Sequence, residues 1–249
     1  MAERARLRPV VDAAFDRVRP VALARDQTLP VTGPLTGLFP DGALPRGIVA
    51  TIAGPGAASL ALGLAAAPSV SGSWVALVGL PGTGLAAAAE LGVALERVVV
   101  VAPPEPAAWP SVVAALVGAF DLVLVGPHHR VPAVAARRLV ARARERGTVL
   151  VIVPGPLGAG RTPVWPEGAD LRLVATGATW HGLARGHGHL RWRQLQVEAS
   201  GRRGLARVRR VDLLLPGPSG HIELAGTDEL APTAPDPIEE IVPIASQAG

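Results

Sequence analysis

Five short runs of apolar residues lie between residues 48 and 153, and polar residues rarely interrupt them. They are IVATIA at 48–53, WVALVGL at 74–80, RVVVVA at 97–102, DLVLVG at 121–126 and TVLVIV at 148–153. Continuous runs of this length are typical of strands that are buried on both faces of a parallel sheet. The pattern therefore predicts five parallel strands.

The segments that separate these runs carry apolar residues at helical spacing. They are SLALGLAAA, TGLAAAAELGV, PSVVAALVGAF and VPAVAARRLVARARERG. Strands that alternate with helices predict an α/β fold in which helices flank a mainly parallel sheet.

After Trp165 the apolar residues begin to alternate with polar ones, as they do in strands that expose one face to solvent. The segments DLRLVAT, HLRWRQLQVEA and ARVRRVDLLLP predict an antiparallel extension of the sheet, with GRRG at 201–204 as the turn of a C-terminal hairpin. Arg209 and Arg210 are adjacent and break the alternation, which favours a bulge or an edge position there.

Composition divides the chain into three parts. Residues 1–29 predict a basic helical arm, residues 30–215 the core domain, and residues 216–249 a disordered tail that is rich in Pro and has six acidic residues but no Arg. The arm either packs on the core or docks a partner, and the tail either docks a partner or shields the basic hairpin. The apolar candidates for docking are Phe15, Ile238, Ile241, Val242 and Ile244.

The 24 basic residues are all Arg, and the chain contains no Cys. These absences exclude a Schiff-base lysine, a phosphate-loop lysine, a cysteine nucleophile, a disulfide and a thiolate metal site. Residues 48–89 carry no charge, but Gly54-Pro55-Gly56 and Pro68-Ser69 interrupt them before they reach the length of a membrane span. We therefore expect a soluble, cytoplasmic protein that does not enter a membrane.

A glycine-rich turn follows the first predicted strand, where a nucleotide-binding α/β protein would hold phosphate. It contains Gly54, Pro55, Gly56 and Ser59. A phosphate loop also needs a Lys for the β- and γ-phosphates, and this chain has none. The turn therefore predicts a degenerate phosphate loop and no bound cofactor.

The stretch LPVTGPLTGLFPDGALPRGIVATIAGPGAASLALGLAAA resembles the start of a RecA-type recombinase core. The resemblance continues through SWVALVGLPGTGLAAAAELGVALERVVVV, FDLVLVG, AARRLVARARERGTVLVIV and ADLRLVATGATW, and so covers about residues 30 to 215. Among RecA-related proteins the chain is most similar to the actinobacterial-type ImuA-like proteins, a degenerate group. That family is associated with SOS-induced mutagenic translesion synthesis.

The departures from active RecA all fall at ATPase positions. The resemblance places Leu80 where the glutamate that activates water would stand, Gly126 where the Walker B aspartate would stand, and Gly155 where the γ-phosphate-sensing glutamine would stand. Without the lysine and the aspartate, nothing neutralises the triphosphate or holds magnesium. The resemblance therefore implies a RecA fold that is kept as a scaffold and is not an enzyme.

Arginines near Trp192 are the candidates for contact with DNA, because arginine binds phosphate and aromatic rings stack on bases. The full set of candidates is Arg161, Arg191, Trp192, Arg193, Arg202, Arg203, Arg207, Arg209 and Arg210. The alternative is a solvated edge of the sheet.

The six histidines are predicted to be exposed loop residues, and no metal site is expected because no supporting carboxylate is evident. They are His128, His129, His181, His187, His189 and His221.

The functional hypothesis is a non-catalytic adaptor in SOS-induced error-prone translesion DNA synthesis. The resemblance implies an ImuB-type Y-family-like polymerase subunit as direct partner and, through it, an error-prone replicative-type polymerase. RecA and single-stranded DNA are further candidate partners. The alternative hypothesis is a regulator of recombination that binds DNA through the arginine hairpin.

Overall fold

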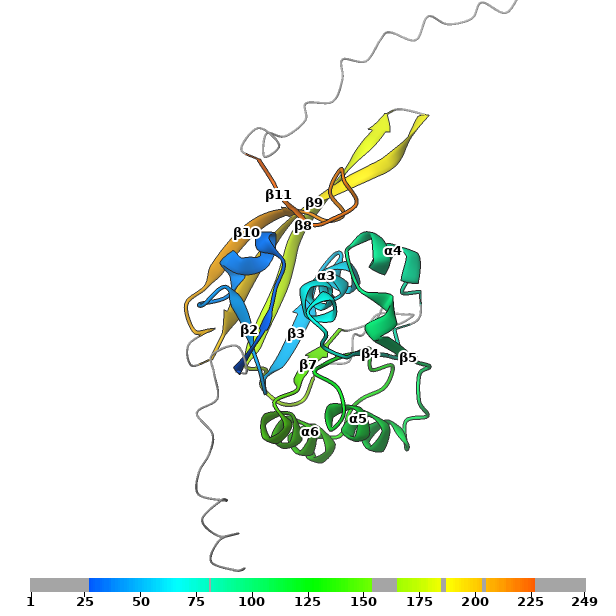
Figure 1. The fold of residues 1–249 in the computed structure, drawn as a ribbon, viewed down its shortest axis with the longest axis vertical. Helices are drawn as coiled ribbons and strands as arrows, with labels where there is room; N and C mark the ends of the chain where they lie inside the picture. Colours follow the sequence, from blue (N-terminus) through cyan, green and yellow to red (C-terminus); the bar gives the residue numbers. More distant parts are fainter. Residues whose placement is uncertain (1–26, 81, 154–164, 185–186, 203–204, 227–249) are drawn as a thin grey trace, which may run out of the picture.

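A single nine-stranded sheet organises the described part of the chain (Figure 1). The computed structural model describes residues 27–80, 82–153, 165–184, 187–202 and 205–226. The strand order in the sheet is β11-β10-β9-β8-β3-β7-β6-β4-β5. The predicted arm (1–26) and residues 227–249 of the predicted tail lie outside the described residues.

The five apolar runs form the parallel strands that the pattern predicted. They are β3 (Val49–Ala53), β4 (Val75–Val78), β5 (Val98–Val101), β6 (Leu122–Val125) and β7 (Val149–Ile152). All residues of β4, β6 and β7 are buried. β5 differs because it forms the edge of the sheet, where Val99 and Val100 are exposed.

Helices cover both faces of the sheet. On one face α3 (Ala57–Val70) and α4 (Leu85–Glu90) pack over the larger apolar core, and on the other α5 (Trp109–Val117) and α6 (Ala133–Arg146) pack over a second core. The mainly parallel sheet flanked by helices is thus confirmed. The break expected at Pro68-Ser69 is wrong, because α3 continues through Pro68 to Val70.

Shorter elements complete this half of the fold. Two 3-10 helices, η1 (Gly33–Leu38) and η2 (Leu95–Arg97), accompany a separate two-stranded sheet. That sheet pairs β1 (Thr28–Pro30) with β2 (Ala43–Pro45) in antiparallel orientation.

The antiparallel extension is confirmed, but its first two strands are longer than predicted. β8 (Leu171–Ala184) pairs in parallel with β3 and in antiparallel orientation with β9 (His187–Gly201). Register shifts lie between Thr176 and Ala178 and between His181 and Leu183. These shifts interrupt the alternation of apolar and polar residues in β8, so the predicted strand ended before the observed one does.

The third strand of the extension, β10 (Arg209–Leu214), pairs with β9 without a register shift. The bulge considered at Arg209 and Arg210 is therefore wrong. The edge position is right, because the two-residue strand β11 (Glu223–Leu224) pairs only with the far end of β10.

The tail boundary predicted at residue 216 is too early. Residues 216–226 belong to the fold, since β11 adds to the sheet and Ile222 is buried in the larger core. Glu223 is also held in place, because its carboxylate accepts hydrogen bonds from the hydroxyl and backbone N–H of Ser219. These hydrogen bonds lower the pKa of Glu223.

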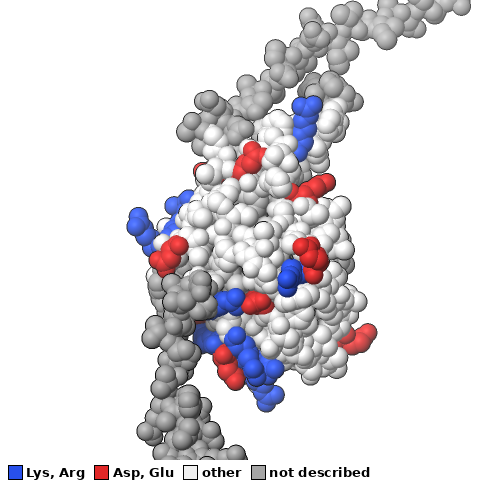
Figure 2. Space-filling view, in the orientation of Figure 1, with Lys and Arg blue, Asp and Glu red and all other residues white. Residues whose placement is uncertain are grey.

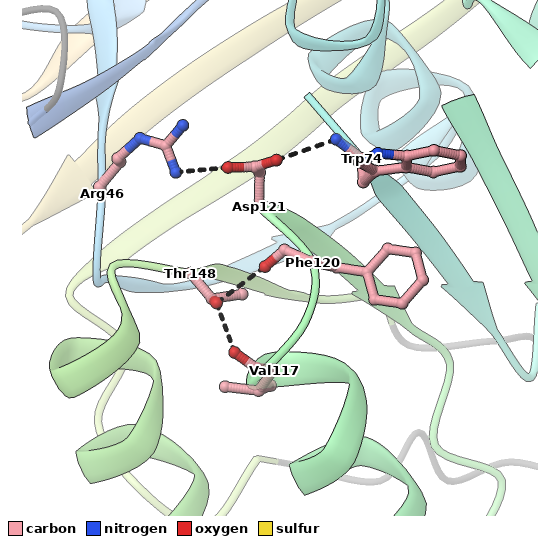
Figure 3. A network of polar contacts seen from close by, with 6 residues as sticks. All are labelled: Arg46, Trp74, Val117, Phe120, Asp121 and Thr148. Carbon is pink, nitrogen blue, oxygen red and sulfur yellow. Dashed lines mark hydrogen bonds and ion pairs between the residues drawn. The ribbon is translucent and has the colours of Figure 1, made fainter. Parts of the chain in front are cut away.

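Polar contacts tie together the amino-terminal ends of three central strands (Figure 3). Asp121, just before β6, accepts hydrogen bonds from Arg46 at 2.8 Å and from the backbone N–H of Trp74 at 2.9 Å. Thr148, just before β7, is buried and donates its hydroxyl to the carbonyls of Val117 and Phe120. This end of the sheet therefore serves stability, and any ligand is expected at the carboxyl ends of the strands.

Among the described residues, no helix is both long enough and apolar enough to cross a membrane.

Candidate functional site

The glycine-rich turn lies where the sequence predicted it, between β3 and α3. The strand ends at Ala53 and the helix begins at Ala57, so only three residues connect them. Gly54 and Gly56 both have positive φ, 94° and 76°, which disfavours other residues there. A phosphate loop has four residues between its two glycines, whereas this turn has only Pro55. The turn is too short to surround a phosphate chain.

Gly54 also has a packing role that no nucleotide requires. A Cβ atom at this position would overlap the backbone carbonyl oxygen of Ala175 in β8. The glycine therefore allows the turn to approach the neighbouring strand closely. This contact explains the glycine without a ligand.

The guanidinium of Arg193, in β9, lies against the N-terminus of α3. Its Nη2 donates to Ser59 Oγ at 3.1 Å, and its Nε donates to the carbonyl of Leu215 at 2.9 Å. A Cβ atom at Gly56 would lie 2.6 Å from Arg193 Nη2. Burial lowers the pKa of Arg193. The side chain that the sequence suggested for DNA contact thus fills the space beside the degenerate turn.

The ends of β4 and β6, where the resemblance placed two further ATPase residues, are in close backbone contact. Gly79 follows β4 and Gly126 follows β6, and a Cβ atom at Gly126 would overlap the carbonyl oxygen of Gly79. The imidazole of His128 hydrogen-bonds to that same carbonyl. Leu80 packs against the larger core. An aspartate at position 126 would therefore not fit between these strands.

Gly155 and Arg161 lie outside the described residues, as do Arg203 and the docking candidates Phe15, Ile238, Ile241, Val242 and Ile244. Their predicted roles stay predictions.

The arginine hairpin predicted for DNA contact is not one surface. Arg191, Trp192 and Arg193 lie in the half of β9 that is paired with the end of β8. Arg202 follows β9 at its other end, about 30 Å along the strand direction from Arg193. The hairpin of β9 and β10 therefore exists as predicted, but its described arginines lie in two separate groups, and their contact with DNA stays a prediction.

The second group of described arginines comprises Arg202, Arg207, Arg209 and Arg210, and part of its charge is neutralised. Arg210 forms an ion pair with Glu198 at 2.8 Å across β9 and β10. Arg209 donates to the carbonyl of Arg207. On the face shown in Figure 2, basic and acidic side chains are interspersed over a largely uncharged surface. This arrangement fits a solvated edge of the sheet.

Sequence reasoning overlooked Trp180, which forms a cross-strand pair with Arg193. The guanidinium carbon of Arg193 lies 5.0 Å from the centre of the Trp180 ring. On the opposite face of the strands, His181 stacks on Trp192 with 5.4 Å between ring centres and 10° between planes. The sequence did contain a feature that could have drawn attention to this pair of strands, because residues 171–197 include Arg and Trp but no Asp or Glu.

The sequence predicted that all six histidines are loop residues, and this is wrong for three of them. His181, His187 and His189 lie in β8 and β9, whereas His128 and His129 follow β6 and His221 precedes β11. Burial lowers the pKa of His129, and the neighbouring His128 lowers it further. Within the part of the chain that the structure describes, no three His, Asp or Glu side chains gather where they could hold a metal ion.

Comparison with known proteins gives two matches. A relative in Mycobacterium tuberculosis (strain ATCC 25618 / H37Rv), described as uncharacterized protein Rv3395c, is 39% identical over 134 residues. This match covers 53% of the chain and 59% of the relative, so the chain spans about three fifths of that protein's length. The second match, over residues 37–159, contains the degenerate turn, Gly79 and Gly126. Over those residues the chain is similar to the family described as the MT3502 N-terminal domain.

Proposed function

We propose that this chain is a RecA-type scaffold without nucleotide hydrolysis, which acts as an adaptor in error-prone translesion DNA synthesis. The observation that carries the proposal is the close packing at the carboxyl ends of β3, β4 and β6, where the sequence placed the degenerate phosphate loop and the missing acidic residues. Gly54 lies against Ala175, Gly126 lies against Gly79, and Arg193 lies on Gly56. An open α/β sheet binds its ligand at this edge, so the tight packing at these three strand ends favours a role in which the fold presents surfaces to other macromolecules.

The RecA part of the proposal is supported by the order of the elements. The turn and α3 follow β3, which lies between β8 and β7 in the sheet. The antiparallel strands continue the sheet beyond β8, as the alternating pattern after Trp165 predicted. The role in mutagenesis rests on the sequence resemblance to ImuA-like proteins. From it we propose an ImuB-type Y-family-like polymerase subunit as direct partner, with an error-prone replicative-type polymerase reached through it.

We expect the purified chain to hydrolyse no ATP above background in the presence of magnesium. The physical reason is that no lysine or Walker B carboxylate is available to neutralise the phosphates. Phosphate release is measured for the wild-type chain and for Ser59→Ala, which lacks the hydroxyl nearest the degenerate turn. Magnesium-dependent release that falls in Ser59→Ala would contradict the proposal.

The adaptor role is tested by co-purification from DNA-damaged cells of the source organism. The tagged full chain is compared with a chain that ends at Gly226, because residues 216–226 are part of the fold and their removal would damage it. Nuclease treatment and washing at high salt remove partners that are held only by DNA. We expect the Y-family-like subunit to remain with the full chain. Its loss from the shortened chain would assign the docking segment to residues 227–249.

Recovery of nothing but nuclease-sensitive proteins would contradict the adaptor role. The alternative function, a regulator of recombination that binds DNA through the arginine hairpin, is less favoured as a whole because the arginines form two separate groups. RecA remains a candidate partner that the same experiment would detect.

A further inference from the structure

The ends of β8 and β9 form a two-stranded ribbon that extends away from the rest of the fold (Figure 1). We refer to residues 178–183 and 188–194 as the distal ribbon. An isolated two-stranded ribbon is only marginally stable in water, so a protruding one usually serves a purpose. This ribbon exposes large apolar side chains, since Trp180 is 40%, Leu183 60% and Leu190 48% exposed.

The two tryptophans of the distal ribbon are held in defined orientations. Arg193 lies over the ring of Trp180 on the face of the ribbon that continues into the larger core. His181 stacks on Trp192 on the opposite face. Each ring thus has a neighbour that restricts its rotation, which lowers the entropy lost when a ligand stacks on it.

The ribbon is also free of negative charge. No Asp or Glu occurs between residues 171 and 197, whereas Arg172, Arg191 and Arg193 lie in the two strands. Arg191 is exposed and forms no ion pair among the described residues. The guanidinium of Arg193 already donates hydrogen bonds to Ser59 and to the carbonyl of Leu215. Among the described arginines of the distal ribbon, Arg191 is therefore the one that remains available to a ligand, and Arg193 positions Trp180.

We propose that the distal ribbon binds single-stranded nucleic acid that passes around it, with one base stacked on Trp180 on one face, another on Trp192 on the opposite face, and a phosphate held by Arg191. Exposed aromatic rings next to cations are the elements that non-sequence-specific binding of single strands uses. In a duplex the bases already stack on one another, so the indole rings would gain little from it. A protein partner would have to be acidic to match this charge, and it would not need two oriented indole rings to stack on. The inference does not depend on the adaptor role.

The proposal is tested with the full chain and a fluorescently labelled oligothymidylate, whose binding is followed by fluorescence anisotropy over a series of salt concentrations. Trp180→Ala and Trp192→Ala are each expected to weaken binding about tenfold. Trp180→Phe is expected to retain most of the affinity, because phenylalanine still offers a ring for stacking. Arg191→Gln is expected to reduce the slope of log Kd against log salt by about 0.7.

The structure offers a matched control at the opposite end of the sheet. Trp74 is 42% exposed and has the guanidinium of Arg97 over its ring at 5.2 Å, so it repeats the pair formed by Trp180 and Arg193. We expect Trp74→Ala to leave binding unchanged, as should Arg207→Ala in the second group of arginines. Thermal melting of each variant separates loss of binding from loss of fold.

Three results would overturn the proposal. The first is failure of the wild-type chain to bind the oligonucleotide at low salt. The second is an equal loss in Trp74→Ala and Trp180→Ala, which would show that the ribbon is not the site. The third is loss of the polymerase subunit in co-purification by ribbon variants that still bind DNA normally. That result would make the ribbon a protein-docking surface, while failure of the adaptor role alone leaves the oligonucleotide measurement unaffected.

Discussion

Gly126→Ala is expected to lower the free energy of unfolding by about 3 kcal/mol. The new Cβ would overlap the carbonyl oxygen of Gly79 and would lie 2.7 Å from Leu80 Cδ2. The backbone cannot move aside easily, because the N–H of Gly126 donates to the carbonyl of Val78 at 2.8 Å and β6 is paired on both sides. Chemical denaturation followed by tryptophan fluorescence measures the effect.

Gly33→Ala is the control for this substitution, since a Cβ atom there would have no neighbour within 4 Å. We expect it to change the free energy of unfolding by less than about 0.5 kcal/mol. Equal stability of the two variants would refute the close contact between the ends of β4 and β6. The same contact predicts that Gly126→Asp, which would place an acid where the resemblance puts the Walker B aspartate, also destabilises the fold.

Asp170→Ala is expected to lower the free energy of unfolding by a similar amount, about 3 kcal/mol. Asp170 is only 7% exposed and immediately precedes β8. Its Oδ2 accepts the backbone N–H of Val49 at 3.1 Å, and its Oδ1 accepts from Arg144 Nη2 at 2.9 Å. Removal of the carboxylate would leave the buried N–H of Val49 without a partner at the start of the central strand.

Two variants show whether this loss comes from the buried hydrogen bond. Asp170→Asn keeps an oxygen that can accept from Val49, so it is expected to cost about half as much. Glu167→Ala removes the other carboxylate that pairs with α6, an exposed contact of 3.5 Å with Arg137, and is expected to cost less than about 0.5 kcal/mol. If Glu167→Ala destabilised the protein as much as Asp170→Ala, general loss of charge would explain both. Urea denaturation of the four proteins decides between these accounts.

The parallel half of the fold could be predicted because its signal is local. Strands buried on both faces must be apolar at every position, so β4, β6 and β7 are visible as uninterrupted runs. The absence of lysine was equally visible, and a chain without lysine cannot form a phosphate loop of the usual kind.

The antiparallel half was predicted less well because its pattern is irregular. Register shifts near Gly177 and Gly182 interrupt the alternation in β8, so the strand appeared to end early and Trp180 was overlooked. The boundary at residue 216 was wrong for another reason. The segment is rich in Pro and Gly, as a tail would be, yet Ile222 is buried in the core.

The sequence by itself determined the fold class, the order of strands and helices, the degenerate turn and the absence of the residues that ATP hydrolysis needs. These properties depend on residue type and local spacing. Only the tertiary structure decided that Arg193 fills the space beside the turn, that Gly54 lies against Ala175, and that the arginines form two groups. Such features depend on contacts between residues more than a hundred positions apart, or on the length and register of paired strands. Local sequence patterns do not show these contacts or the strand register, because both are determined by how the elements pack together.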